Sequence, residues 1–138
     1  MKRTARYIAI AILASIPLTA AAQNQQQGQQ PKDAATMAAE AADYLQGMLS
    51  LDDRQVFQVD STLQFNYSHM MAELEAVRRR GASNTDLYEV VSDKWSEAND
   101  TTFAKIFSDE QWKKYMRTPY GKQKRARDKR LAKKAVKE

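Results

Sequence analysis

Residues 51–80 read LDDRQVFQVDSTLQFNYSHMMAELEAVRRR and are followed by Gly81. The segment opens with an apolar residue, Leu51, then Asp52 and, three positions later, Gln55. This order is typical of a helix start, because Asp52 can accept from a backbone N–H of the first turn while Gln55 reaches back to the Asp52 amide. Arginines in the last turn suit the helix dipole, and a glycine is a common helix stop. The segment therefore predicts one long helix over 52–80.

The apolar residues of this helix recur at heptad spacing. One set of positions carries Val56, Leu63, Met70 and Val77, and the alternate set carries Tyr67 and Leu74, with Asp60 as the exception. Such spacing predicts a coiled-coil-like seam. Phe57, Phe65 and Met71 lie beside the seam and widen the apolar face beyond what one neighbouring helix covers. Either the flanking helices bury the whole face, or part of it is left as a dimer or client-binding surface.

The same helix-start chemistry returns at residues 107–111, which read FSDEQ. Ser108 takes the place of Asp52 as the capping residue, and Gln111 takes the place of Gln55. Leu51 and Phe107 each precede their cap. They can pack on Val56 and Trp112 respectively, which closes a hydrophobic staple at each helix start. A further helix is therefore expected to begin at Ser108.

Two more helices complete the expected fold. Small and apolar residues at three- and four-residue steps predict helices over 33–50 and 84–106. Residues 118–121, TPYG, should break or bend the chain, and 122–138 should form a partly ordered, very basic helix. No strand pattern competes. The prediction is an all-α protein of about four amphipathic helices, forming an elongated hairpin or thin bundle, and we expect a homodimer.

The first 22 residues have the pattern of a secretory signal peptide. A basic start is followed by an apolar stretch over 7–18 and by three alanines, with cleavage expected after Ala22. The alternative is a retained membrane anchor, but the apolar run is shorter than the roughly 20 residues a spanning helix needs. Residues 23–32 are rich in glutamine and are expected to form a disordered linker. The chain has no cysteine, which excludes disulfides and a lipoprotein anchor. We therefore expect a soluble periplasmic protein.

Charge is strongly segregated along the chain. Residues 122–138 carry nine Lys and Arg and two acids, whereas residues 33–121 carry nine Lys and Arg and fifteen acids. The chain is thus an acidic helical domain, 33–121, with a basic tail, 122–138. A signal peptide argues against a nucleic-acid role. An anionic envelope surface or the acidic domain itself is the more reasonable partner of the tail.

No catalytic constellation is present. The carboxylates form no paired motif of recognisable spacing, and the chain has one histidine, His69, and no cysteine to join it in a metal site. His69 is therefore expected to be structural. We predict a protein that is not an enzyme and that needs no cofactor and no metal.

The paired motifs resemble the LTxxQ motifs of the Spy/CpxP-like periplasmic proteins over about residues 33–120. Leu51 and Gln55 match the motif, while Asp52 replaces its threonine. In the second copy Gln111 matches, Phe107 replaces leucine and Ser108 replaces threonine. The resemblance implies thin, curved helical dimers that act as ATP-independent chaperones or as inhibitors of envelope-stress sensor kinases. The chaperone member is expected to have a basic concave surface, which the acidic domain lacks and the tail could supply.

The leading hypothesis is an envelope binding protein of chaperone or stress-regulatory type, whose partners are unfolded envelope proteins or a sensor kinase. Contact candidates on the long helix are Phe57, Phe65, Tyr67 and Met71. The cations expected to capture partners are Lys122, Lys124, Arg125, Arg127, Lys129, Arg130, Lys133 and Lys134. The motif residues would be architectural. The alternative is a structural or adaptor protein whose tail binds acidic lipid at the envelope surface.

Overall fold

The computed structural model describes residues 32–137, and all their regular structure is α-helical, which confirms the all-α prediction. The predicted signal peptide, and the predicted linker up to residue 31, lie outside the described residues. The helices are α1 (Ala34–Leu49), α2 (Asp53–Arg79), α3 (Thr85–Ile106), α4 (Asp109–Tyr115) and α5 (Pro119–Ala135). Within residues 32–137 no helix combines the length and apolar character that crossing a membrane requires.

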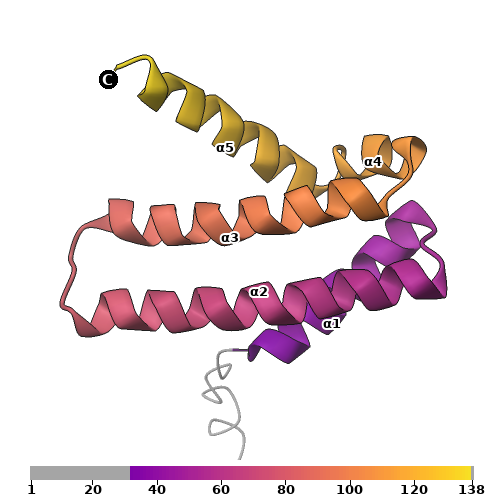
Figure 1. Cartoon of the computed structure of the whole chain (residues 1–138), viewed down its shortest axis with the longest axis horizontal. Helices are drawn as coiled ribbons and strands as arrows, with labels where there is room; N and C mark the ends of the chain where they lie inside the picture. The colour runs from indigo at the N-terminus through magenta and orange to yellow at the C-terminus, as the bar shows by residue number, and fades with distance from the viewer. Residues whose placement is uncertain (1–31, 138) are drawn as a thin grey trace, which may run out of the picture. The chain divides into compact units, whose positions relative to one another are not determined.

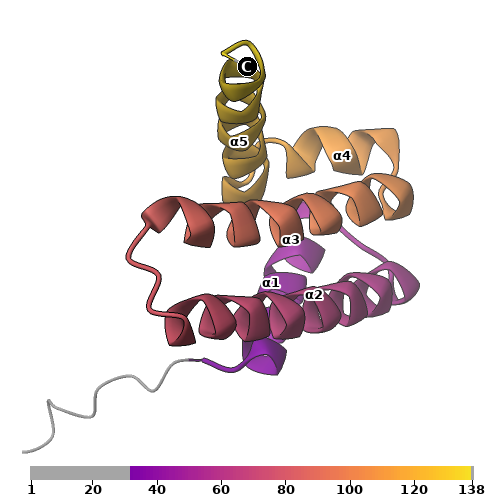
Figure 2. The ribbon, with the colours of Figure 1, turned by 60° about the vertical axis from the view of Figure 1, so that its left-hand side comes forward.

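The two longest helices, α2 and α3, lie side by side and run in opposite directions (Figure 1). A short turn joins them, and Gly81 adopts a left-handed φ of 68° in it. α1 packs on α2, α4 contacts α1, and α5 contacts α3. α5 runs back over α3 and diverges from it towards the C-terminus, as the second view also shows (Figure 2).

The core lies where α1, α2 and the end of α3 meet. Alanines on one face of α1 allow close helix approach, and Leu45 of α1 and Leu63 of α2 are 1% and 2% exposed. Burying a leucine of this kind stabilises the fold by about 1.5–3 kcal/mol. The aromatic side chains of Phe103, Phe107 and Tyr115 close the core at one end.

The predicted seam of α2 is partly reproduced. Leu63 is buried and the other seam positions are half-buried, but Val59 and Asn66 are buried as well, so the contact surface is broader than a heptad seam. This follows from α2 having two neighbours, α1 and α3, rather than one. In α1, Met48 lies three residues after the buried Leu45 and is nevertheless 51% exposed.

A break was expected over residues 118–121, but the structure has it at 116–118, as one short turn between α4 and α5. The Thr118 hydroxyl donates to the Tyr115 carbonyl at 2.6 Å and accepts from the Gly121 amide at 3.4 Å, so one side chain ends α4 and starts α5. Pro119 then occupies the first helical position, where its missing N–H costs nothing. The helical part therefore continues past residue 121 to Ala135, instead of ending in a partly formed tail.

Candidate functional site

Both predicted capping boxes form. Asp52 Oδ1 accepts from the Gln55 amide at 2.8 Å, and Gln55 Oε1 accepts from the Asp52 amide at 3.1 Å. Ser108 and Gln111 repeat the arrangement, at 3.2 Å and 2.9 Å. Leu51 and Phe107, the residues before the caps, are both buried in the core. These residues fix the starts of α2 and α4.

The two motif glutamines also bind each other. Gln55 Nε2 donates to Gln111 Oε1 at 2.8 Å, and Gln111 Nε2 donates to Gln55 Oε1 at 3.1 Å. Gln55 Nε2 also donates to the Ile106 carbonyl at the end of α3, at 3.0 Å. This glutamine pair joins two helix starts that lie 56 residues apart in the chain. Sequence analysis found each box but not the bond between them.

The basic tail packs against the acidic face of α3. Arg130 contacts Glu89 at 2.8 Å and Asp93 at 2.7 Å, and Lys134 contacts Glu89 at 3.4 Å. Lys124 lies 3.5 Å from Glu97. The acidic domain is therefore the partner of these cations. Among residues 32–137 no ion pair is formed by Lys122, Arg125, Lys129 or Lys133.

Arg127 is the buried member of this set. It is 4% exposed and donates to Asp100, which is 3% exposed, and to Glu97 at 2.7 Å. The Tyr115 hydroxyl donates to the other oxygen of Asp100. Burial and the Asp100 carboxylate raise the pKa of Tyr115 well above its ordinary value, so the phenol remains a donor. Arg127 of α5 therefore covers Asp100.

Two of the contact candidates, Phe57 and Phe65, lie on an exposed face of α2. They are 72% and 59% exposed. The Phe65 ring lies 4.1 Å from the His69 ring and 6.5 Å from that of Trp95 on α3, centroid to centroid. We call Phe57, Phe65, His69 and Trp95 the outer aromatic face. A shallow groove between α2 and α3 adjoins it, lined by Phe65, Ala98 and Thr102 among others.

The other two candidates do not belong to this face. Tyr67 is half-buried, packs against the core and lines a cavity on another side of α2. Burial raises the pKa of Tyr67 to about 12, which also marks it as an interior residue. Met71 is half-buried. Of the four contact candidates, only Phe57 and Phe65 are therefore largely exposed.

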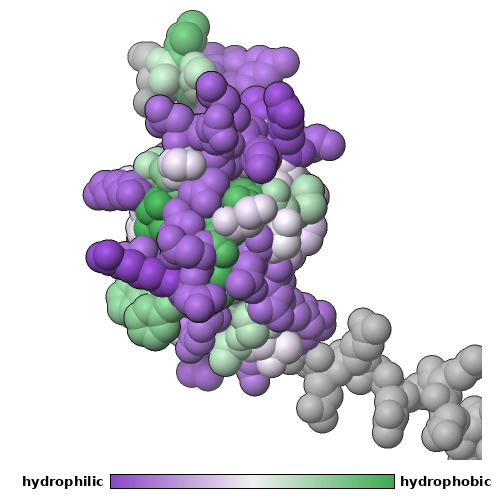
Figure 3. Space-filling model, turned by 90° about the vertical axis from the view of Figure 1, so that its right-hand side faces the viewer, coloured by the Kyte–Doolittle hydropathy of each residue, from purple (hydrophilic) through white to green (hydrophobic). Residues whose placement is uncertain are grey.

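The end of the molecule that carries the α1–α2 and α3–α4 connections is mostly hydrophilic, with smaller apolar patches between the polar side chains (Figure 3). The glutamine pair therefore does not open onto a continuous apolar surface at this end. This placement agrees with an architectural role for the motif residues.

The described residues contain no group of three or more His, Asp or Glu side chains that could hold a metal ion. His69 Nδ1 lies 2.8 Å from the Phe65 carbonyl, and its ring packs between aromatic neighbours. Comparisons of the chain with protein-family models, with curated proteins and with solved structures gave no match.

Proposed function

We propose that the protein is a periplasmic, ATP-independent binding protein for unfolded envelope proteins, of chaperone or stress-regulatory type. The observation that carries this proposal is the outer aromatic face. Phe57 and Phe65 stay largely exposed although α1 and α3 both flank α2. Neither ring belongs to the buried core, so packing of the core does not explain two phenylalanines at these positions.

The chemistry of this face suits apolar segments of a client. Exposed aromatic rings bury large apolar areas on contact, and clusters of them mark interaction sites. Lys94 lies over the Trp95 ring at 4.8 Å while it is paired with Glu73 at 2.6 Å. The adjoining groove exposes the hydroxyl-bearing side chains of Ser61 and Thr102. Rings beside small polar groups allow contact with varied sequences rather than with one fixed motif.

The test is suppression of aggregation of a chemically unfolded protein without ATP. We expect the unaltered protein to suppress aggregation and Phe57→Ser/Phe65→Ser to lose most of this effect. The matched control is Leu87→Ser/Val90→Ser on α3, since those side chains are 46% and 58% exposed and lie outside the face. Equal suppression by both double variants would refute the role of the outer aromatic face, and no suppression by the unaltered protein would refute the chaperone proposal.

A second candidate function is binding to an anionic envelope surface through α5. Lys129, Ala132, Lys133 and Val136 line one side of that helix, and their three- and four-residue spacing gives a basic stripe with an apolar edge. Neither lysine is paired with an acid among residues 32–137. This arrangement suits an interfacial helix.

Co-sedimentation with vesicles containing anionic lipid tests this candidate. Binding should fall steeply with salt, because exposed charges are screened. Lys129→Gln/Lys133→Gln should abolish binding, whereas Lys113→Gln/Lys114→Gln, which removes two exposed lysines of α4, should leave it. Equal loss in both variants would indicate that net charge alone matters.

We also propose that the protein is a homodimer. The support is the unpartnered outer aromatic face, which a second copy would partly cover. Sedimentation equilibrium measures the mass directly. A monomer at all concentrations would refute the dimer and leave the whole face to clients.

A further inference from the structure

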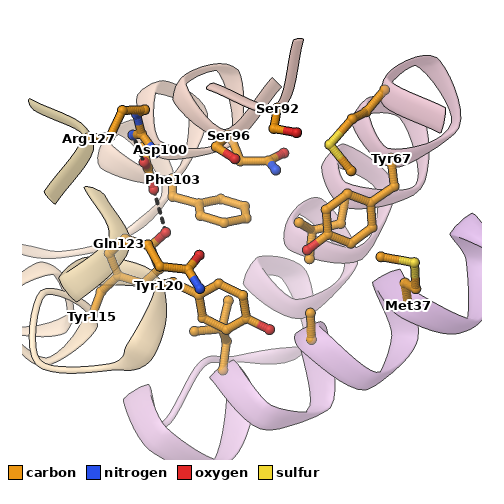
Figure 4. Close-up of a pocket in the computed structure, with 15 residues that line it drawn as sticks. Met37, Tyr67, Ser92, Ser96, Asp100, Phe103, Tyr115, Tyr120, Gln123 and Arg127 are labelled. Atoms are coloured by element: carbon orange, nitrogen blue, oxygen red, sulfur yellow. Dashed lines mark hydrogen bonds and ion pairs between the residues drawn. The ribbon is translucent and has the colours of Figure 1, made fainter. Parts of the chain in front are cut away.

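A cavity of about 290 Å³ lies between the helices, apart from the outer aromatic face. Its apolar wall includes Leu45, Leu63 and Phe103, which are buried. Figure 4 shows the rings of Phe103, Tyr67 and Tyr120 directed towards the same space from α3, α2 and α5. Tyr67 and Tyr120 also line an outer hollow beside the cavity, so they stand at an entrance to it.

The cavity exists because small side chains face it. Ser92 and Ser96 lie four residues apart on α3, hence on one side of the helix, and Ala41 of α1 lines the same space. Larger residues at these positions would fill it. Protein interiors rarely leave voids much larger than a water molecule, and this cavity is much larger than one and partly open to solvent, so a ligand can enter it.

One buried polar side chain has bonding capacity left over in the cavity. Asn99, 7% exposed, accepts from Asn66 Nδ2 at 2.7 Å through its side-chain oxygen. Its Nδ2 donates to no residue in the part of the chain that the structure describes, although Asn99 lines the cavity. This Nδ2 is not one of the fully buried unpartnered atoms, so an acceptor oxygen of solvent or of a ligand can reach it.

The charges at the cavity offset one another. Arg127 lines it but is already paired with Asp100 and Glu97, and Lys124 lies near Glu97. A charged ligand would therefore have no counter-ion of its own and would lose its hydration on entry. The remaining polar groups are hydroxyls and carboxamides, including Ser92, Ser96 and Gln123. Such a lining selects an uncharged ligand with a hydrogen-bonding oxygen.

Size narrows the ligand further. A cavity of about 150 Å³ is sufficient to bind benzene, and this one is roughly twice as large. We propose that the cavity binds an uncharged aromatic molecule of one or two rings that carries a hydroxyl or carbonyl oxygen. The rings lie among Phe103, Tyr67 and Tyr120, and the oxygen accepts from Asn99. This site is independent of client binding at the outer aromatic face.

The probe is 2-naphthol, titrated into the purified protein by calorimetry. The comparison ligand is 2-naphthoate, which has the same rings and a negative charge. We expect saturable binding of one 2-naphthol per chain and at least tenfold weaker binding of 2-naphthoate. Absence of 2-naphthol binding up to its solubility limit, or equal binding of both ligands, would overturn the proposal.

Variants locate the site. Ser96→Leu places a large side chain in the cavity and should weaken 2-naphthol binding at least tenfold. Ser68→Leu is the matched control, since Ser68 is exposed on α2 and does not line the cavity; it should change binding less than twofold. Ser92→Leu is a second filling variant in case Ser96→Leu fails to fold, as judged by circular dichroism. Unchanged binding in a folded filling variant would place the ligand elsewhere and refute the site.

Discussion

Removal of the Arg127 side chain should strongly destabilise the protein. In Arg127→Leu the guanidinium disappears, and Asp100, 3% exposed, keeps only the Tyr115 hydroxyl as a hydrogen-bond partner. A buried carboxylate with half of its partners removed is far less stable than a paired one, because neither water nor another cation replaces the lost donor. The cost comes from this stranded charge rather than from the loss of Arg127 packing.

The magnitude follows from how deeply each partner is buried. Breaking a buried ion pair by removing one member costs about 3–5 kcal/mol. The Glu97 side chain is 47% exposed, so its bond to Arg127 adds little. We therefore expect about 3 kcal/mol, the lower end of the range. For a domain of this size that loss corresponds to a melting temperature lower by roughly 12–24 °C.

The assay is urea unfolding followed by far-ultraviolet circular dichroism on a double-mutant cycle. Asp100→Asn/Arg127→Leu should recover to within about 1 kcal/mol of the unaltered protein, since a neutral buried pair carries no stranded charge. Lys129→Leu, an exposed position of the same helix, should stay within about 0.5 kcal/mol. If Arg127→Leu cost less than about 1 kcal/mol, or if the double variant were no better than the single one, the buried-charge reasoning would be refuted.

Three further predictions concern the glutamine pair, the half-buried phenol of Tyr67 and two glycines. Gln55→Ala and Gln111→Ala should each lower the free energy of unfolding by about 2 kcal/mol. Because both remove the same amide pair, a urea double-mutant cycle should give a coupling of about 1 kcal/mol. Strict additivity of the two changes would contradict the pairing. Burial raises the pKa of Tyr67 from 10.0 to about 12. The neutral phenol therefore makes its full contribution to the free energy of unfolding below pH 10, and this contribution is lost as pH rises towards 12. The urea midpoint should fall over that interval and fall less in Tyr67→Phe; identical pH dependence would contradict the assignment. Gly121→Ala should destabilise the protein by about 3 kcal/mol in a thermal melt, because a Cβ there collides with the Met116 and Tyr115 backbone. Gly47→Ala is the control: nothing lies within 4 Å of its Cβ, and the change should stabilise the helix by about 0.5–1 kcal/mol. Equal effects of the two changes would rule out the close approach at the α4–α5 junction.

Local chemistry made most of the helices predictable. Asp52 and Ser108, each followed by a glutamine, act through side-chain bonds that span three residues, so the sequence alone contains both partners. The start of α5 was missed although its signal is of the same kind. Thr118 is its cap and Pro119 its first residue, but a threonine, a proline and a glycine close together also suit a simple break.

Contacts between distant segments could not be predicted in the same way. Asp100 belongs to a row of acids on α3, and nothing in that row distinguishes it from the half-buried acids Glu89, Asp93 and Glu97. Its burial depends on where the turn at Thr118 directs α5, and so on where Arg127 arrives. The heptad spacing placed Phe57 and Phe65 beside the seam and Tyr67 on it, and in the structure the two phenylalanines are largely exposed while Tyr67 packs against the core.

The division of charge within α5 bears on which function is favoured. Arg127, Arg130 and Lys134 recur at three- and four-residue steps and are each paired with an acid of α3. Salt should act unevenly on this contact. Arg130 and Asp93 are partly exposed and are screened, whereas Arg127 and Asp100 are buried and are screened much less. Raised salt should therefore loosen the C-terminal half of α5 and leave the half next to α4 in place, which amide hydrogen exchange can measure. At raised salt the loosened half of α5 would no longer hold its lysines in a fixed arrangement. Client binding that is unchanged at raised salt would therefore have to use the outer aromatic face rather than α5.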